Sequence, residues 1–333
     1  MPARGYLVAF AAGFPDRKDF KDYDAMAETD GIRKDAETYA AIDIGSNAVR
    51  LLIKQLESDT RPLFNKALLL RVPLRLGFDV FAEGKISRKK EKDLIRLMKC
   101  YRQLMKIYNV DDYRACATSA MRDAENGQSV IRTVFKETGI RIEIIGGQEE
   151  AEMIYSNHIE TMRGKKGNFM FVDVGGGSTE INLLADGGLV CSRSYNIGTV
   201  RSLNGSVAES EWQRLRKDMA DLAGSYPGIQ IIGSGGNINK YYRLVPRRDN
   251  RHNRMGVEAL QEIFDRLNAL TVEQRIEEYG LKPDRADVII PAGRIFLTIA
   301  GITGATWIYV PVIGLADGII DWLYTRNHPD PVR

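Results

Sequence analysis

The sequence predicts an α/β protein built from two similar halves. Apolar, strand-like runs alternate along the chain with longer segments of helical periodicity, which is the pattern of layered α/β folds. One pattern, an apolar run that ends in Asp and is followed by a Gly- and Ser-containing turn, occurs twice, at 39–47 and 169–178. About the length of one α/β domain separates Asp43 from Asp173. We therefore expect two related domains with a cleft between the two turns.

Each copy of the pattern predicts a β-hairpin followed by a third strand. The strands are expected at 39–43, 48–56 and 63–72 in the first copy and at 169–173, 179–185 and 189–196 in the second. Each Asp lies at a strand end, where glycines let backbone N–H groups approach a phosphate and the carboxylate can hold a hydrated divalent cation. Each turn is a candidate phosphate-binding loop. For either copy alone, an ordinary Gly-containing hairpin is the alternative.

The segments between the two copies complete the first half. Residues 86–108 are charged and carry apolar residues at helical spacing, which predicts an amphipathic helix. A strand at 114–117, a helix at 129–137, a strand at 142–145 and a helix at 148–161 are expected to follow. The charged, Gly-containing segment 163–167 interrupts the pattern and marks the boundary between the halves.

The second half contains a third candidate phosphate contact. The glycine turn at 233–237 follows an expected strand at 229–232 and opens a helix. A helix N-terminus with small residues attracts anions through its free N–H groups and its dipole, although a plain strand-to-helix turn is the alternative. A helix at 209–222, a strand at 307–310 and a closing helix at 315–324 complete the expected elements.

The composition indicates a globular protein whose chemistry rests on carboxylates. Of 333 residues, 44% are hydrophobic and 27% are charged, and the net charge of +3 is too small to indicate nucleic-acid binding. Cys100, Cys116 and Cys191 are isolated in apolar runs, which favours reduced cysteines in a cytoplasmic protein over disulfides or a zinc site. The three histidines are far apart in sequence, which disfavours a histidine metal cluster or a Ser–His triad.

No membrane segment is expected, because Pro291 and Arg294 interrupt the apolar run 288–302. Residues 1–38 lack periodicity and precede the first strand, so we expect them to be an extension outside the fold. The apolar stretch 6–14 follows Arg4 and resembles a weak signal-peptide core, which leaves secretion as the alternative to a cytoplasmic location.

Three glutamates are candidates for catalysis. Glu149 and Glu150 open the helix that follows Gly146 and Gly147, and either one has the position of a general base. The alternative is that acidic residues are simply favoured in a first helical turn. Glu180 lies in the second hairpin, where strand alternation places it on one face with Ser178 and should direct it into the cleft; a solvent-facing glutamate on an edge strand is the alternative.

Arginines supply candidate anion contacts. Arg122 lies in a turn between a strand and a helix, where a guanidinium can hold a phosphate in a bidentate manner, although a surface arginine is the default. The loop 245–256 contains four arginines and one histidine and is suited to steering a polyanion. A solvated charged loop is the alternative for that segment.

Seven short motifs follow one another between residues 39 and 326. They lie at 41–47, 117–122, 144–151, 172–180, 233–237, 288–293 and 314–318. In this order they resemble the exopolyphosphatase and guanosine pentaphosphate phosphohydrolase (Ppx/GppA) family. The resemblance implies an α/β, two-domain fold that is actin-like and sugar-kinase-like (ribonuclease H-like), with the active site in a cleft between duplicated domains.

The expected domain organisation follows from the motifs and the resemblance. Residues 1–38 are the extension, 39–163 form domain I, and 164–314 form domain II. The resemblance implies that the closing helix, 315–326, packs back on domain I.

The resemblance also implies roles for individual residues. Glu150 is the base that activates the attacking water, and Glu180 is the second catalytic carboxylate. Asp43, Asp173 and Glu180 organise Mg²⁺. The phosphate-binding set is Ser46, Asn47, Arg122, Gly175, Gly176, Gly177, Ser178, Gly235 and Gly236.

The leading hypothesis is a Mg²⁺-dependent exopolyphosphatase acting on inorganic polyphosphate, with guanosine pentaphosphate 5′-phosphohydrolase activity as the nearest alternative. An actin-like ATPase or small-molecule kinase, and a non-catalytic alarmone sensor, are the other classes. The resemblance makes a homodimer plausible. Ala316 and Asn237 depart from residues common in the family, and longer relatives append helical domains that are missing here, so we expect a preference for shorter polyphosphate.

Overall fold

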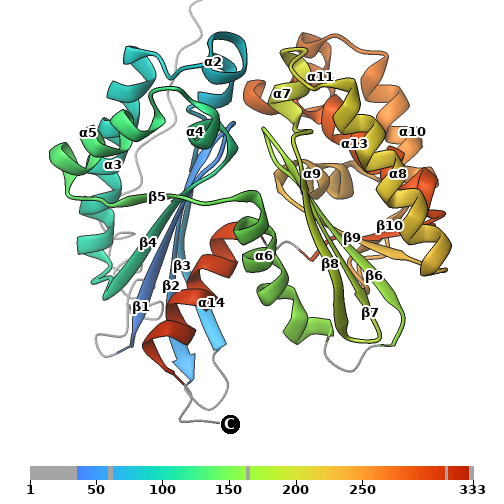
Figure 1. Cartoon of the computed structure of the whole chain (residues 1–333), viewed down its shortest axis with the longest axis horizontal. Helices are drawn as coiled ribbons and strands as arrows, with labels where there is room; N and C mark the ends of the chain where they lie inside the picture. Colours follow the sequence, from blue (N-terminus) through green and yellow to red (C-terminus); the bar gives the residue numbers. More distant parts are fainter. Residues whose placement is uncertain (1–35, 59–62, 163–165, 312–313, 330–333) are drawn as a thin grey trace, which may run out of the picture. The chain divides into compact units, whose positions relative to one another are not determined.

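The computed structural model describes residues 36–58, 63–162, 166–311 and 314–329. Residues Glu37–Arg333 form one compact unit, which is separate from Met1–Ala36. The predicted extension 1–38 falls almost entirely outside the described residues, and the first strand begins at Thr38. Within the compact unit we call the part built on the first sheet lobe I (37–146 and 314–329) and the part built on the second sheet lobe II (166–311) (Figure 1).

Lobe I contains a five-stranded sheet of order β3-β2-β1-β4-β5. The first three strands are an antiparallel meander, and β4 and β5 continue the sheet in parallel with β1. The strands are β1 (Thr38–Ile44), β2 (Val49–Ser58), β3 (Leu63–Val72), β4 (Asp112–Ala117) and β5 (Ile142–Ile144). Because β1 is central, all seven of its residues are buried, and the loop after it starts from a rigid support.

Lobe II repeats this topology. Its sheet has the order β10-β11-β9-β6-β7-β8, in which β8-β7-β6-β9-β11 corresponds to β3-β2-β1-β4-β5. The strands are β6 (Asn168–Val174), β7 (Thr179–Ala185), β8 (Gly188–Tyr195), β9 (Gln230–Ser234), β10 (Arg254–Gly256) and β11 (Trp307–Tyr309). The predicted α/β fold with two duplicated, actin-like lobes is confirmed. The short edge strand β10 is an addition that the sequence pattern did not predict.

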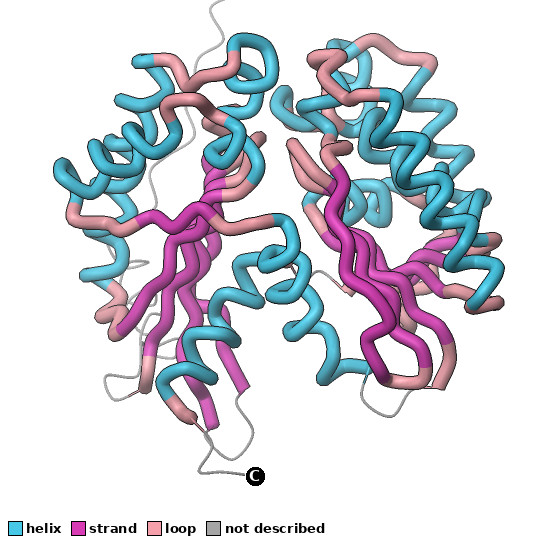
Figure 2. The backbone as a smooth tube through the Cα atoms, in the orientation of Figure 1, coloured by secondary structure: helices cyan, strands magenta, loops and turns pink. Residues whose placement is uncertain are grey.

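Helices cover the outer face of each sheet (Figure 2). Those of lobe I are α2 (Leu76–Glu83), α3 (Arg88–Ile107), α4 (Ser119–Asp123) and α5 (Gly127–Thr138). The long helix predicted from apolar spacing is α3, and its buried residues Leu94, Met98, Tyr101 and Met105 recur at intervals of three and four. The Ser87 hydroxyl caps α3 by accepting a hydrogen bond from Lys90 N–H at 3.3 Å.

The described part of lobe II contains seven helices. They are α7 (Thr199–Leu203), α8 (Glu209–Ser225), α9 (Gly236–Leu244), α10 (Val257–Asn268), α11 (Val272–Tyr279), α12 (Pro283–Ala286) and α13 (Ile289–Thr303). By length and composition the helical stretch Pro283–Thr303 is apolar enough to cross a membrane, so the expectation of no such stretch was wrong. In the structure 61% of it is buried, and Ile289, Phe296 and Ile299 are fully buried in the core of lobe II. Pro291 is tolerated because it lies in the first turn of α13.

Helices α6 (Gly147–Met162) and α14 (Leu315–Asn327) join the two lobes. Helix α6 contacts α14 as well as β7 and β8, and α14 packs on β1, β2 and β4. The core between them includes Ile154, Ile319, Ile320 and Leu323. Helix α6 connects the two lobes along the chain, and its position depends on how α14 packs against it.

We predict that Gly318→Ala destabilises the protein. A Cβ at Gly318 of α14 would lie 2.3 Å from the carbonyl oxygen of Met153 in α6, so the helices would have to move apart. The free energy of unfolding should fall by about 1–3 kcal/mol in a urea titration. The control is Gly301→Ala in α13, where nothing lies within 4 Å of the added Cβ and helix propensity should add about 0.5–1 kcal/mol. Equal unfolding midpoints for wild type and Gly318→Ala would contradict the packing described here.

Candidate active site

The two predicted hairpin turns form equivalent loops that face each other. In lobe I the Gly45 N–H donates to the carbonyl oxygen of Ala48 at 3.1 Å, and in lobe II the Gly175 N–H donates to that of Ser178 at 3.0 Å. The loops approach so closely that a Cβ at Gly176 would lie 2.9 Å from the Cβ of Ser46. Only glycine permits this approach, because any side chain at 176 would push the lobes apart.

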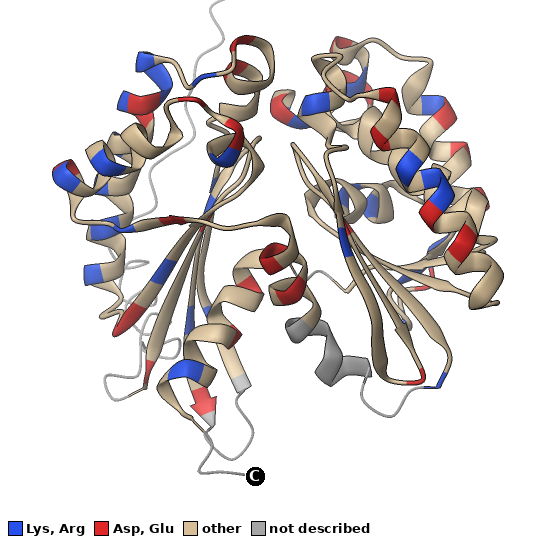
Figure 3. Cartoon of the chain, in the orientation of Figure 1, with Lys and Arg blue, Asp and Glu red and all other residues tan. Residues whose placement is uncertain are grey.

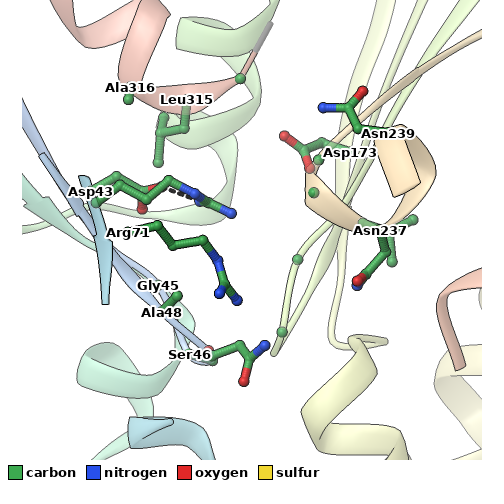
Figure 4. A pocket seen from close by; sticks show the side chains of 18 of the residues that line it. Asp43, Gly45, Ser46, Ala48, Arg71, Asp173, Asn237, Asn239, Leu315 and Ala316 are labelled. Carbon is green, nitrogen blue, oxygen red and sulfur yellow. Dashed lines mark hydrogen bonds and ion pairs between the residues drawn. The ribbon is translucent and has the colours of Figure 1, made fainter. Parts of the chain in front are cut away.

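A cleft with a cavity of about 490 Å³ lies between the lobes at these loops. Figure 4 shows Asp43 and Asp173 on its opposite walls, with Ser46 and Arg71 on the side of lobe I. The structure brings ten of the predicted site residues together in the lining of this cleft: Asp43, Ser46, Asn47, Glu150, Asp173, Gly175, Gly176, Ser178, Gly235 and Gly236.

Three predicted site residues lie outside the cleft lining. Gly177 is buried against Ser119, whose Oγ would be 2.2 Å from an added Cβ, so its role in this structure is close packing. The Arg122 guanidinium donates to the carbonyl oxygen of Ile145 at 3.0 Å. Glu180 is 2% exposed and lies behind the loop, where its Oε1 accepts a hydrogen bond from Ser194 Oγ at 2.9 Å. Glu180 therefore faces inward and is not a solvent-facing residue of an edge strand.

The equivalent strand positions carry opposite charges in the two lobes. In lobe I Asp43 pairs in register with Arg50, whereas in lobe II Asp173 pairs with Glu180. The Arg50 guanidinium forms an ion pair with the Asp43 carboxylate at 2.5 Å. The acidic charge of the cleft is therefore concentrated on the side of lobe II and on Glu150.

Burial of these carboxylates favours their protonated forms. The pKa of Glu150 is raised well above its usual value, first by burial and then by the charges of Glu180, Asp43 and Asp173. Burial, together with Asp173, raises the pKa of Glu180 to about 7, although the hydrogen bond from Ser194 opposes the rise. Burial also raises the pKa of Asp173. Three carboxyl groups in one region thus titrate above their ordinary range.

The structure distinguishes the two neighbouring glutamates that the sequence left open. Glu150 lines the cleft, and its buried Oε2 has no hydrogen-bond partner among the described residues. Glu149 instead forms an ion pair at 2.7 Å with Arg114, a residue of β4. A buried acceptor without a partner is costly, so Glu150 is the glutamate placed to receive a proton from a bound molecule.

The donor set of the cleft suits a magnesium ion held partly by substrate. Within the described part of the chain, no three His, Cys, Asp or Glu side chains are grouped closely enough to form a complete metal site. Mg²⁺ commonly uses only one or two carboxylates and completes its shell with water and phosphate oxygens. The repulsion among Glu150, Glu180 and Asp173 and the unpartnered Glu150 Oε2 are features that such a cation would relieve.

A set of cations lines the cleft that the sequence analysis did not predict. Strand β3, helix α9 and the segment around α12 contribute Lys66, Arg71, Lys240, Arg243, Lys282 and Arg285. Burial, with Arg71 and Arg50 nearby, lowers the pKa of Arg285 to about 10. Lys240 and Arg243 follow the third glycine turn at a spacing of three, which is a signal that helical periodicity could have revealed.

The predicted basic loop does not contribute to this cleft. In that loop Asp249 accepts hydrogen bonds from His252 and Arg254, and Arg248 donates to Asn250. Arg247 lines a different cavity, next to α10. The alternative of a charged surface loop fits this arrangement.

Ion pairs connect the lobes on both sides of the cleft. Arg71 of β3 pairs with Asp284 of α12 at 2.5 Å, and Arg75 pairs with Asp287. The Asn47 side-chain amide also donates to the backbone carbonyl oxygen of Asp284 at 3.1 Å. On the other side Arg201 pairs with Asp123. These contacts fix the width of the cleft in the conformation described.

Comparison with known proteins assigns this fold and cleft to a class. The family model described as the Ppx/GppA phosphatase family matches residues 65–324. The chain is 26% identical to a solved Ppx/GppA family member from Aquifex aeolicus, with a TM-score of 0.69 over 88% of this chain and 99% of that one. This chain belongs to the Ppx/GppA phosphatase family, as its motifs predicted.

Curated relatives carry several names. The chain is 30% identical to a bifunctional 3-dehydroquinate synthase/phosphatase of Fusobacterium nucleatum over 81% of this chain, but it spans only 44% of that relative's length. It is 24% identical to Exopolyphosphatase 1 of Mycobacterium tuberculosis, covering 75% of this chain and 77% of the relative. It is 25% identical to a guanosine-5′-triphosphate,3′-diphosphate pyrophosphatase of Aeromonas hydrophila, covering 89% of this chain and 61% of the relative.

We predict that Glu180 makes the metal-free protein less stable as the pH rises. A carboxyl whose pKa is about 7 in the folded state and about 4.5 when unfolded stabilises the fold below pH 4.5 and loses that contribution as the pH rises through 7. The difference in unfolding free energy between pH 5 and pH 8, measured in chelator, should shrink by on the order of 3 kcal/mol in Glu180→Gln. The exposed Glu209→Gln is the control. An unchanged difference in Glu180→Gln would refute the elevated pKa.

Proposed function

We propose that the protein is an exopolyphosphatase that releases terminal phosphate from inorganic polyphosphate by means of a base-activated water. One observation carries the proposal: a buried glutamate with an unpartnered carboxylate oxygen lies in the same cleft as three glycine turns and a wall of cations. Hydrolysis of a phosphoanhydride requires a positioned water, a base and neutralised phosphate oxygens, and this cleft offers a group for each need.

Different residues of the chain bind the terminal phosphate and accept the proton. In this proposal the backbone N–H groups of Gly176 and Gly236, with the hydroxyls of Ser46 and Ser178, hold the terminal phosphate, while the Gly175 N–H closes the turn by donating to the carbonyl oxygen of Ser178. Glu150 accepts the proton of the attacking water at its free carboxylate oxygen. Its raised pKa makes it a stronger base than an ordinary glutamate near neutral pH.

Asp173 and Glu180, with Asp43, are the residues that would hold Mg²⁺ in this proposal. When bound, the ion supplies neutralisation of charge on the phosphate oxygens and polarisation of water. Asp43 differs from the other two because Arg50 already neutralises it. The negative charge that would attract a cation therefore comes mainly from lobe II.

The set of cations that lines the cleft supports the proposal of a polyanionic substrate. Lys66 and Arg71 on lobe I face the region occupied by Lys240, Arg243 and Arg285 on lobe II. So many positive charges around one cleft stabilise a ligand that carries a charge on each successive unit. Inorganic polyphosphate has that character, because each phosphate beyond the terminal one is also anionic.

A specific observation favours guanosine pentaphosphate as the second candidate substrate. The same cleft has an apolar part to which Leu52, Leu69, Leu315 and Ala316 contribute, and Leu69 is 51% exposed. An exposed leucine inside a polar cleft provides a surface on which a planar base can pack. Phosphohydrolase activity at the 5′ end would use the same turns and the same glutamate.

We predict that Glu150→Gln abolishes phosphate release while leaving the fold intact. Free phosphate would be measured with polyphosphate, guanosine pentaphosphate and ATP as separate substrates in the presence of Mg²⁺. The variant should lose at least about 100-fold in kcat, because the amide that replaces the carboxylate cannot accept the proton of the attacking water. Turnover of ATP alone by wild type would favour an ATPase or kinase, and tight binding without turnover of any substrate would favour a sensor.

We also predict that neutralising one cation on each wall weakens substrate binding. Lys66→Gln combined with Lys240→Gln should raise KM for polyphosphate about tenfold and leave kcat within about twofold, because both side chains line the cleft and neither takes part in the proposed proton transfer. The effect should shrink in 0.5 M salt, where charge interactions are screened. Lys217→Gln on the exposed surface of α8 is the matched control. A fall in kcat at unchanged KM would show that the wall acts on the reaction and not on binding.

A further inference from the structure

A buried arginine lies directly behind the proposed base. Arg114 of β4 is 7% exposed, and its guanidinium is enclosed by side chains from three other elements. It pairs with Glu143 of β5, with Glu149 of α6, and lies over the ring of Trp322 in α14 at 4.0 Å from the centroid. Arg114 is not among the residues that line the cleft. Arg114 therefore acts within the protein.

The contact with Glu149 ends in the first turn of α6, one residue from Glu150. That turn begins at Gly147, and the Glu150 N–H donates to the carbonyl oxygen of Gly146 at 3.0 Å. Figure 3 shows the acidic first turn of α6 at this place, between the ends of β5 and α14. Successive residues of a helix point about 100° apart, so fixing Glu149 on one side of the turn determines the side on which Glu150 projects.

The two carboxylates on Arg114 form a natural comparison. The distances to its Nη2 are 2.8 Å for Glu143 and 2.7 Å for Glu149, and the two side chains are 46% and 45% exposed. Glu143 also accepts a hydrogen bond from Arg114 Nε at 2.9 Å, so its loss should cost at least as much stability as the loss of Glu149. They connect Arg114 to different segments: Glu143 belongs to strand β5, and Glu149 belongs to the turn that carries Glu150.

We propose that Arg114 is a positioning residue for catalysis: through Glu149 it fixes the first turn of α6 so that the Glu150 carboxylate is held in the cleft. The guanidinium is held in place by stacking on Trp322. Its backbone is also fixed, because β4 is an interior strand of the sheet. The inference rests on the proposed function only in taking Glu150 as the base. Misplacing a reacting group by a fraction of an ångström lowers the rate of reaction with little effect on binding.

The test compares Glu149→Gln with Glu143→Gln in the full chain. Glu149→Gln should lower kcat for phosphate release about three- to tenfold at unchanged KM, whereas Glu143→Gln should stay within about twofold of wild type. Glu149→Asp keeps the charge but not the reach, so it should behave like Glu149→Gln. Arg114→Met should lower kcat by the same factor, and adding Glu149→Gln to it should lower kcat no further.

A second measurement needs no turnover. Amide hydrogen exchange in the segment 147–154 should be faster in Glu149→Gln than in wild type and unchanged in Glu143→Gln. Equal exchange and equal kcat in the two glutamine variants would overturn the positioning role, as would a loss that appears only in KM. If wild type releases phosphate from no substrate, the proposed function fails by itself, and the exchange comparison still decides whether Arg114 orders this turn.

Discussion

The arrangement of this protein depends on the contact between two glycine loops. Gly176 lies against the loop of lobe I: a Cβ on it would be 2.9 Å from the Cβ of Ser46 and 3.1 Å from the backbone nitrogen of Asn47. These approaches bring the ends of β1 and β6 to the same place, so two carboxylates that are far apart in sequence meet across one cleft. The ion pairs of Arg71, Arg75 and Arg201 then fix the lobes around that contact. Side chains larger than hydrogen at the loops would remove the basis of all of these contacts.

The duplicated topology does not produce a symmetric site. Lobe I places Arg50 where lobe II places Glu180, each in register with the Asp of its hairpin. As a result the Asp43 carboxylate is neutralised by its own lobe, whereas Asp173 and Glu180 repel one another and Glu150. A duplicated fold can therefore carry similar loops on both sides while concentrating the unpaired negative charge on one side, where the proposed function places a cation and a proton-accepting group.

Much of this could be predicted from the sequence, because the relevant signals are local. Strand alternation, the two Asp-containing turns and the apolar spacing of α3 each extend over a continuous segment. The short helices α2, α7 and α12 were not predicted, since four to eight residues show too little periodicity. The cation wall was missed because Lys66, Lys240 and Lys282 come from three distant segments and meet only in the folded protein. Position in the helix alone could not decide between Glu149 and Glu150, which both suit a first helical turn, and only the family resemblance selected Glu150.

The raised pKa values mean that protonation and cation binding compete in the cleft. Burial and mutual repulsion mean that Glu180, and with it Glu150 and Asp173, hold protons more tightly than carboxylates in water. A divalent cation and a proton therefore compete for the same oxygens, and any cation that binds must displace protons. The cations that line the rest of the cleft do not remove this competition, because Arg50 pairs with Asp43 and Arg71 pairs with Asp284. The carboxyl oxygens of Glu150, Asp173 and Glu180 therefore have no ion-pair partner among the described residues and can exchange a proton for a cation, at a cost in stability that the packed lobes must offset.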